Sequence, residues 1–177
     1  MLYYKKISSS LGEITLRSDG QFLTGLWFAN DKHYGDKDIQ DAQTAELPVF
    51  ALAEKWLAEY FAGCKPKVKV PLQFTGTDFQ KCVWKILQNI PYGRLVTYGD
   101  IACEIAAQRG LARMSAQAVG GAVGRNPLCI IIPCHRVIGA NGSLTGYGGG
   151  MWRKVRLLEI EKADMSKLTV PTKGTAL

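Results

Sequence analysis

Residues 129–139 have the sequence CIIIPCHRVIG, and this stretch decides how the rest of the chain is interpreted. Its apolar, β-branched first part, residues 129–132, predicts a buried strand. Cys134 follows directly after a proline that stiffens the chain, and a polar, glycine-rich loop comes next. A thiol at the end of a buried strand, beside His135 and Arg136, is placed for chemistry because a neighbouring cation favours the thiolate.

Upstream of this stretch, residues 115–124 have the sequence SAQAVGGAVG, with no charge and almost no bulky side chain. We predict a helix over about 114–123, preceded by a helix over 98–107 that Thr97 caps. Two short helices joined by a turn at Arg109-Gly110 suggest a helix-turn-helix. A smooth helix face permits close approach to another surface, which is either a DNA groove or a neighbouring helix.

The N-terminal part predicts a small sheet followed by a helix. Residues 12–18 alternate apolar and polar side chains, Asp19-Gly20 is typical of a two-residue hairpin turn, and residues 21–29 return as a strand. Apolar residues at helical spacing then predict a helix over 46–62. The polar segment 31–43 between them is predicted to be a loop.

Charge divides the chain unevenly. Residues 1–74 hold nine Lys/Arg and nine Asp/Glu, whereas residues 75–177 hold thirteen and six, so the whole net charge of +7 lies in the second part. We therefore predict an N-terminal domain over 1–74 and a C-terminal domain over 75–177 that ends in a short tail. A one-sided basic balance indicates either a polyanionic partner or merely a basic surface.

Further helices are predicted in the second domain. Thr77 and Gln80 form a capping box that opens one helix, and an amphipathic helix covers residues 152–161. Trp84 and Trp152 lie on apolar faces and are predicted to pack. The fold class is therefore α+β: a small N-terminal antiparallel sheet domain with a helix, and a mostly helical C-terminal domain that contains the helix-turn-helix and the cysteine.

Several classes of protein are disfavoured. The five cysteines have irregular spacing and only two histidines accompany them, so we expect neither a metal site nor a disulfide framework. No apolar run is long enough for a membrane span, and no signal peptide is evident. No glycine fingerprint for a dinucleotide or for S-adenosylmethionine occurs, so no cofactor is expected. We expect a cytoplasmic protein.

Three motifs carry a resemblance to a known family: IPCHRVIG at 132–139, AVGGAVGRNP at 118–127, and GYGGG at 146–150. Together they resemble the O6-alkylguanine-DNA alkyltransferases, also called methylated-DNA–protein-cysteine methyltransferases, over residues 75–162. The resemblance implies direct repair of double-stranded DNA by transfer of an alkyl group from O6 of guanine to a cysteine, in a single turnover with base flipping. It leaves O4-alkylthymine open as a second substrate and implies a monomer.

The resemblance also implies roles for individual residues. Cys134 matches the alkyl acceptor, and His135 matches the base that activates the thiol through a bound water. Glu161 matches the carboxylate that orients the histidine, and Asn126 matches a hinge between the DNA-binding helix and the acceptor. Tyr98 matches the tyrosine that helps turn the target nucleotide and assists the leaving guanine.

A second set of residues is implied to contact DNA or the flipped base: Ala116, Gln117, Ala118, Gly120, Arg136, Tyr147, Gly148 and Lys154. One of them departs from the family pattern, since many members have an intercalating arginine where this chain has Gln117. Glutamine fills the same gap without the charge, which predicts weaker and less salt-dependent DNA binding.

Three alternatives stay open beside this interpretation. A binding module would flag alkylated bases without repairing them, but such relatives have the cysteine replaced. A helix-turn-helix regulator would need base-reading side chains that residues 115–124 lack. A cysteine hydrolase would need an oxyanion hole, for which the sequence shows no signature.

Overall fold

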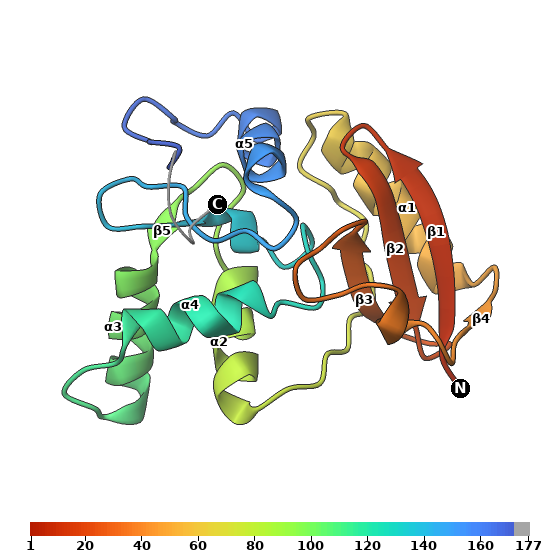
Figure 1. Ribbon diagram of the computed structural model, residues 1–177, viewed down its shortest axis with the longest axis horizontal. Helices are drawn as coiled ribbons and strands as arrows, with labels where there is room; N and C mark the ends of the chain where they lie inside the picture. The colour runs from red at the N-terminus through yellow and green to blue at the C-terminus, as the bar shows by residue number, and fades with distance from the viewer. Residues whose placement is uncertain (172–177) are drawn as a thin grey trace. The chain divides into compact units, whose positions relative to one another are not determined.

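The computed structural model describes residues 1–171, and residues 172–177, the end of the predicted tail, lie outside the described part. The chain forms two compact units (Figure 1). Unit 1 consists of Met1–Thr75 together with Pro127–Cys129, and unit 2 consists of Gly76–Asn126 and the chain from Ile130 onward. Within the described residues, no helix is long and apolar enough to cross a membrane.

Unit 1 is a four-stranded sheet with one long helix. The strands are β1 (Tyr3–Ser9), β2 (Gly12–Ser18), β3 (Leu23–Phe28) and β4 (Gln43–Thr44), in the order β3-β2-β1-β4. The three long strands pair antiparallel, whereas β4 pairs parallel to β1, so the sheet is mixed rather than purely antiparallel as predicted. A short 3-10 helix, η1 (Asp36–Asp38), precedes β4.

Helix α1 (Pro48–Phe61) packs against this sheet, as Figure 1 shows. Its buried side chains recur at helical spacing, and they pack against the apolar residues of β2 and β3. Burial of these apolar side chains provides the core of unit 1. The fully buried apolar members from α1, β2 and β3 are Phe50, Ala53, Tyr60, Ile14, Leu16, Leu23, Leu26 and Phe28.

One prediction for unit 1 is wrong, and one strand was missed. The turn between β2 and β3 has four residues rather than two, because the carboxylate of Asp19 accepts hydrogen bonds from the amides of Gln21 and Phe22 and the strand register shifts after Arg17. The strand β1 was not predicted at all. Its lysines interrupt the alternation of apolar and polar residues that would indicate a strand. Lys5 forms ion pairs with Glu46, which precedes α1, and with Glu54 in α1.

Unit 2 is built on α2 (Asp78–Gln88), α3 (Tyr98–Arg109), α4 (Ala116–Gly124) and α5 (Met151–Ile160). The predicted capping box of Thr77 and Gln80 is confirmed, and Thr97 caps α3 in the same way. Gly110, in the left-handed conformation, ends α3. The turn that follows leads into α4, which Ser115 caps, and α4 packs against α3 as a helix-turn-helix requires.

The small residues of α4 allow close packing on one side of the helix, and on the other side the helix is exposed. The indole nitrogen of Trp84 donates to the carbonyl of Ala122 at 2.9 Å, and a methyl group on Gly120 would lie 3.8 Å from the ring of Tyr98. The opposite side, which includes Gln117 and Gly121, is exposed. Packing on neighbouring elements is therefore confirmed for one face of this smooth helix, while the approach of its exposed face to DNA stays a prediction.

The predicted strand over residues 129–132 is wrong. Only Leu128 forms a β-bridge, with Leu26 of β3, and the chain then turns at Ile130, whose φ is +69°. A β-branched residue is rarely found in this left-handed region. Cys134 instead begins the 3-10 helix η2 (Cys134–Arg136), and the two-residue strand β6 (Val137–Ile138) then pairs parallel to β5 (Val96–Thr97).

The packing prediction for Trp152 is also wrong, since 54% of its surface is exposed. Helix α5 directs Lys154, Leu157 and Leu158 into the core of unit 2. Residue 152 lies two positions before Lys154, on the opposite side of a helix with 3.6 residues per turn. Trp84, in contrast, is buried as predicted.

Candidate active site

All five residues predicted to be catalytic lie in unit 2. Cys134 is nearly buried, with 6% of its surface exposed. Its amide donates to the carbonyl of Ile132 at 2.8 Å, and Pro133 between them has φ −80° and ψ 65°. These angles define an inverse γ-turn. Proline suits its centre because the ring already sets φ near this value.

Asn126 holds the same turn from α4. Its side-chain amide donates to the carbonyl of Ile132 at 2.7 Å, so this oxygen accepts two hydrogen bonds, one from Asn126 and one from the Cys134 amide. Asn126 is 2% exposed and immediately follows the helix that is predicted to contact DNA. The amide therefore connects the end of α4 with the peptide that orients the thiol.

His135 and Glu161 form a fully buried pair. The imidazole Nε2 lies 2.6 Å from Oε1 of Glu161, and neither side chain is exposed. A carboxylate at this distance requires a proton on Nε2, so the neutral imidazole keeps its basic lone pair on Nδ1. Burial lowers the pKa of His135, although Glu161 partly opposes this shift, and the neutral form is therefore the ground state.

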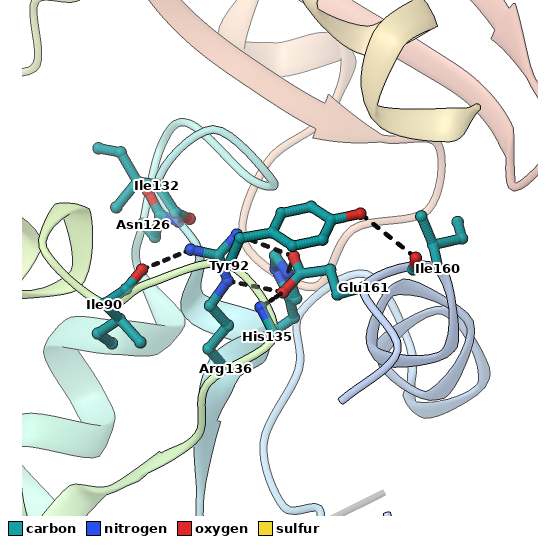
Figure 2. A network of polar contacts seen from close by, with 9 residues as sticks. Ile90, Tyr92, Asn126, Ile132, His135, Arg136, Ile160 and Glu161 are labelled. Atoms are coloured by element: carbon teal, nitrogen blue, oxygen red, sulfur yellow. Dashed lines mark hydrogen bonds and ion pairs between the residues drawn. The ribbon is translucent and has the colours of Figure 1, made fainter. Parts of the chain in front are cut away.

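Glu161 is the most heavily bonded side chain of the site (Figure 2). Arg136 donates to both carboxylate oxygens at 2.9 Å, and the amide of Gly93 donates to Oε2 at 2.8 Å. The remaining guanidinium nitrogen donates to the carbonyl of Ile90. A bidentate arginine–carboxylate pair of this kind fixes orientation as well as charge.

Tyr92 completes the enclosure of this ion pair. Its ring lies 5.7 Å from the guanidinium carbon of Arg136, and its hydroxyl donates to the carbonyl of Ile160 at 3.3 Å (Figure 2). Burial alone raises the pKa of the Glu161 carboxyl, but the hydrogen bonds from His135 and Arg136 outweigh it and hold the pKa far below its usual range. Glu161 is therefore an anion at every physiological pH.

Lys154 is the other buried charge, with none of its surface exposed. Its ammonium group donates to the carbonyls of Val137 and Thr145 at 2.6 and 2.8 Å. Burial lowers the pKa of Lys154 to about 8, and a charge interaction with Cys134 opposes the shift. Because Arg136 is already paired with Glu161, Lys154 is the cation available to stabilise a Cys134 thiolate.

Tyr98, the first residue of α3, reaches the same loop. Its hydroxyl donates to the carbonyl of Thr145 at 3.0 Å, the oxygen that Lys154 also contacts. Burial raises the pKa of Tyr98 to about 12, and interaction with Cys134 adds to the shift. A methyl group on Gly146 would lie 3.2 Å from this hydroxyl, and Gly146 has φ +67°, so glycine is required there for two reasons.

The residues predicted to contact DNA or the flipped base fall into three groups. Ala116, Gln117 and Ala118 are exposed on the first turn of α4. Arg136 and Lys154 are buried and bonded within unit 2, and this placement favours positioning roles over the DNA contacts that we expected.

The third group consists of the remaining predicted residues, Tyr147, Gly148 and Gly120. Tyr147 is 7% exposed and Gly148 is half-buried, while Gly120 faces the ring of Tyr98. No cluster of three or more His, Cys, Asp or Glu side chains able to hold a metal ion occurs in residues 1–171.

Sequence reasoning missed Tyr92, Gly93 and Thr145 as parts of the site. None of the three lies in a motif that carries the family resemblance. Gly93 has a positive φ of +73°, which allows its backbone amide to point at Glu161. In the sequence, only the presence of a glycine indicates this conformation. Thr145 acts through its carbonyl oxygen, which no side-chain pattern reveals.

Comparisons with known proteins agree with this geometry. The DNA-binding domain of 6-O-methylguanine DNA methyltransferase matches residues 78–163, and the ribonuclease-like domain of the same family matches residues 2–74. The chain belongs to the 6-O-methylguanine DNA methyltransferase family. Both of its units thus have a counterpart in that family.

Relatives in this family are similar over nearly the whole chain. The methylated-DNA–protein-cysteine methyltransferase of Mycobacterium tuberculosis is 45% identical over 163 residues, which cover 92% of this chain and 94% of that protein. The constitutive Bacillus subtilis protein of the same name is 38% identical and covers 92% and 96%. A crystal structure of Mycobacterium tuberculosis OGT in complex with DNA is 44% identical, with a TM-score of 0.79 over 94% of each chain.

Proposed function

We propose that this chain repairs DNA by transferring a methyl or larger alkyl group from O6 of guanine in double-stranded DNA to Cys134. The observation that carries the proposal is the buried thiol beside a neutral histidine whose Nε2 is held by Glu161 at 2.6 Å. Membership of the family and the DNA complex of a 44% identical relative support DNA as the partner. We expect the protein to act as a monomer in the cytoplasm.

The transfer is a displacement at the alkyl carbon. His135 takes the thiol proton, through a bound water as the family resemblance implies, and the Cys134 sulfur then attacks the carbon attached to O6. The new S–C bond forms as the C–O6 bond breaks, and the guanine leaves with the electron pair and takes up, through water, the proton that His135 had accepted. Lys154 stabilises the thiolate, while Glu161 stabilises the imidazolium that forms.

Tyr98 serves the leaving guanine. Because its pKa lies near 12, the hydroxyl stays protonated at neutral pH, and it reaches the guanine as a donor by exchanging its hydrogen bond to the Thr145 carbonyl for one to the base. Tyr147 and Gly148 wall the pocket for the flipped base. Flipping requires unstacking, which costs a few kcal/mol, and contacts between DNA and the exposed first turn of α4 offset this cost.

A thioether has no good leaving group, so one chain repairs one lesion and no cofactor takes part. Incubation with a duplex that contains O6-methylguanine tests the proposal by intact-mass measurement. We expect a gain of one CH2 unit that maps to Cys134, with transfer stopping at one methyl per chain. An unmodified protein after prolonged incubation contradicts the proposal. The same assay with O4-methylthymine decides the second substrate.

Cys134→Ala separates repair from mere recognition of the lesion. In cells that lack other alkyltransferases, the variant is expected to give no protection against a methylating agent. Protection equal to that of the wild type would instead identify a binding module that signals to other repair proteins. The positions exposed on α4 remain intact in this variant, so DNA binding serves as the internal control.

A further inference from the structure

The loop that closes the proposed guanine pocket carries few side chains of its own. Four of the six residues from Thr145 to Gly150 are glycines. Gly146 and Gly150 have positive φ angles of +67° and +97°. Consecutive glycines leave a backbone with wide conformational freedom, so groups outside the loop must hold it in one shape.

Two neighbouring side chains from the first turn of α5 fold back onto this loop. The indole of Trp152 lies over Gly150, where an added methyl group would be 3.6 Å from two atoms of the indole. The guanidinium of Arg153 donates to the carbonyl of Gly149 at 2.7 Å. Its central carbon lies 4.7 Å from the centroid of the Trp152 ring, which is cation–π distance.

The exposure of Trp152 indicates a role other than core packing. More than half of its surface is exposed, whereas the core face of α5 is formed by Lys154, Leu157 and Leu158. Trp152 and Arg153 contact each other and adjacent glycines of the loop. They contact the last two glycines of the segment, while Tyr98 and Lys154 hold the carbonyl of Thr145 at its other end.

We infer that Trp152 and Arg153 form a clamp on the Gly148–Gly150 loop that restricts its opening and thereby limits the size of the alkyl group that Cys134 accepts. This inference rests on the proposed function, because the loop matters only if it walls an alkylguanine pocket. A methyl group needs no extra space, whereas a benzyl group requires the loop to move outward. The clamp opposes that movement through the cation–π contact and the charged hydrogen bond.

Single-turnover transfer from two duplexes tests the clamp, one containing O6-methylguanine and one containing O6-benzylguanine, both at saturating DNA. For Trp152→Ala and Arg153→Ala we expect the benzyl-to-methyl rate ratio to rise about fivefold to tenfold, in line with the loss of one exposed cation–π contact or one charged hydrogen bond. Trp152→Phe keeps an aromatic face and should stay close to the wild type.

Arg156→Ala is the matched control. Arg156 lies on the same helix, is exposed and pairs with Glu159 rather than with the loop. Its removal should leave the ratio unchanged. If Trp152→Ala changes only the DNA concentration needed for half-saturation, the pair is a DNA contact and the clamp is refuted. An unchanged ratio in both alanine variants refutes it as well.

Hydrogen exchange provides a readout that needs neither DNA nor activity. The amide of Gly150 donates to the carbonyl of Tyr147 at 3.0 Å, so its exchange reports loop opening. We expect about tenfold faster exchange in Trp152→Ala and no change in Arg156→Ala. If the wild type transfers neither group, the proposed function fails. Exchange that is unaltered by Trp152→Ala refutes the clamp in either case.

Discussion

At the scale of single residues, the site depends on one carboxylate that binds both the Arg136 cation and the neutral imidazole of His135. Glu161 accepts from His135, from Arg136 and from the amide of Gly93, all within a buried environment. Removing one partner of a buried pair is more harmful than removing both, because the charge left behind has lost both water and its counterion. Glu161 is therefore as much a folding determinant as a catalytic one.

Glu161→Gln tests this dual role. The change leaves the Arg136 guanidinium buried without an anion, so we expect the free energy of unfolding in urea to fall by about 3–5 kcal/mol. Alkyl transfer should also slow, since the imidazolium loses its counter-charge. Glu159→Gln, two residues earlier and paired with exposed Arg156, should change stability by less than about 0.5 kcal/mol. Equal losses in the two variants would contradict the assignment.

Lys154 makes a prediction about pH. Its pKa is about 8 in the folded protein and near 10.5 when exposed, so the unfolded chain binds more protons between these values. Stability linked to Lys154 therefore rises from pH 8 to pH 10.5 and is constant outside that window. Relative to Lys154→Met, the wild type should gain up to about 3 kcal/mol of unfolding free energy across the window.

Chemical unfolding of both proteins at a series of pH values checks this difference. The Cys134→Ser background removes the thiol whose charge interaction holds the pKa of Lys154 up, so the gain should begin at lower pH. A difference that does not vary with pH would show that the ammonium group is not desolvated.

Neither Lys154 nor Arg136 could be assigned its buried position from the sequence, because charged side chains are ordinarily exposed and only the tertiary structure encloses them.

At the scale of elements, local signals were the most reliable. The caps of α2 and α3 depend on residues three positions apart, and Thr77 with Gln80 was predicted correctly for that reason. The segment around Ile130 failed because an apolar β-branched run has the composition of a strand, while its conformation is set by the turn that Asn126 and Pro133 stabilise. Composition cannot report a positive φ at an isoleucine.

Helix α4 carries the prediction that concerns DNA affinity. Gln117 is exposed on its first turn, at the position where the family resemblance implies an intercalating arginine in many members. Gln117→Arg should tighten binding to duplex DNA and steepen the dependence of log K on log salt concentration by about one unit, because one more phosphate contact releases one more counterion. Fluorescence anisotropy titrations over a range of salt concentrations measure this slope. An unchanged slope and affinity would mean that residue 117 does not approach the DNA backbone.

At the scale of the whole molecule, the charge division agrees with the division of the fold. The net charge of +7 belongs to residues 75–177, and unit 2 contains every residue proposed for the reaction. The family, the α+β class and the acceptor cysteine were all evident from motifs. The return of the chain into unit 1 at Pro127–Cys129 was not, because it depends on backbone pairing with Leu26.

That return leads to a prediction about a shortened chain that begins at Gly76. Such a chain would retain Leu128 and Cys129, which are 0% and 4% exposed inside unit 1, but would lack the strand that covers them. We expect it to self-associate at concentrations where the full chain does not, since uncovered apolar surface promotes association. Light scattering measures this, and Leu128→Asn should reduce it. A monomeric shortened chain would contradict the prediction.

The excursion of three residues also bears on how the family diversifies. The two units are not modules that a single crossover between genes can exchange. Consider a recombinant that takes residues 1–75 from one relative and the rest of the chain from another. Its Pro127–Cys129 segment, from the second relative, must pair with the β3 strand of the first. Changes at Leu26 and Leu128 are therefore expected to co-vary among relatives, although more than a hundred positions separate them in the chain.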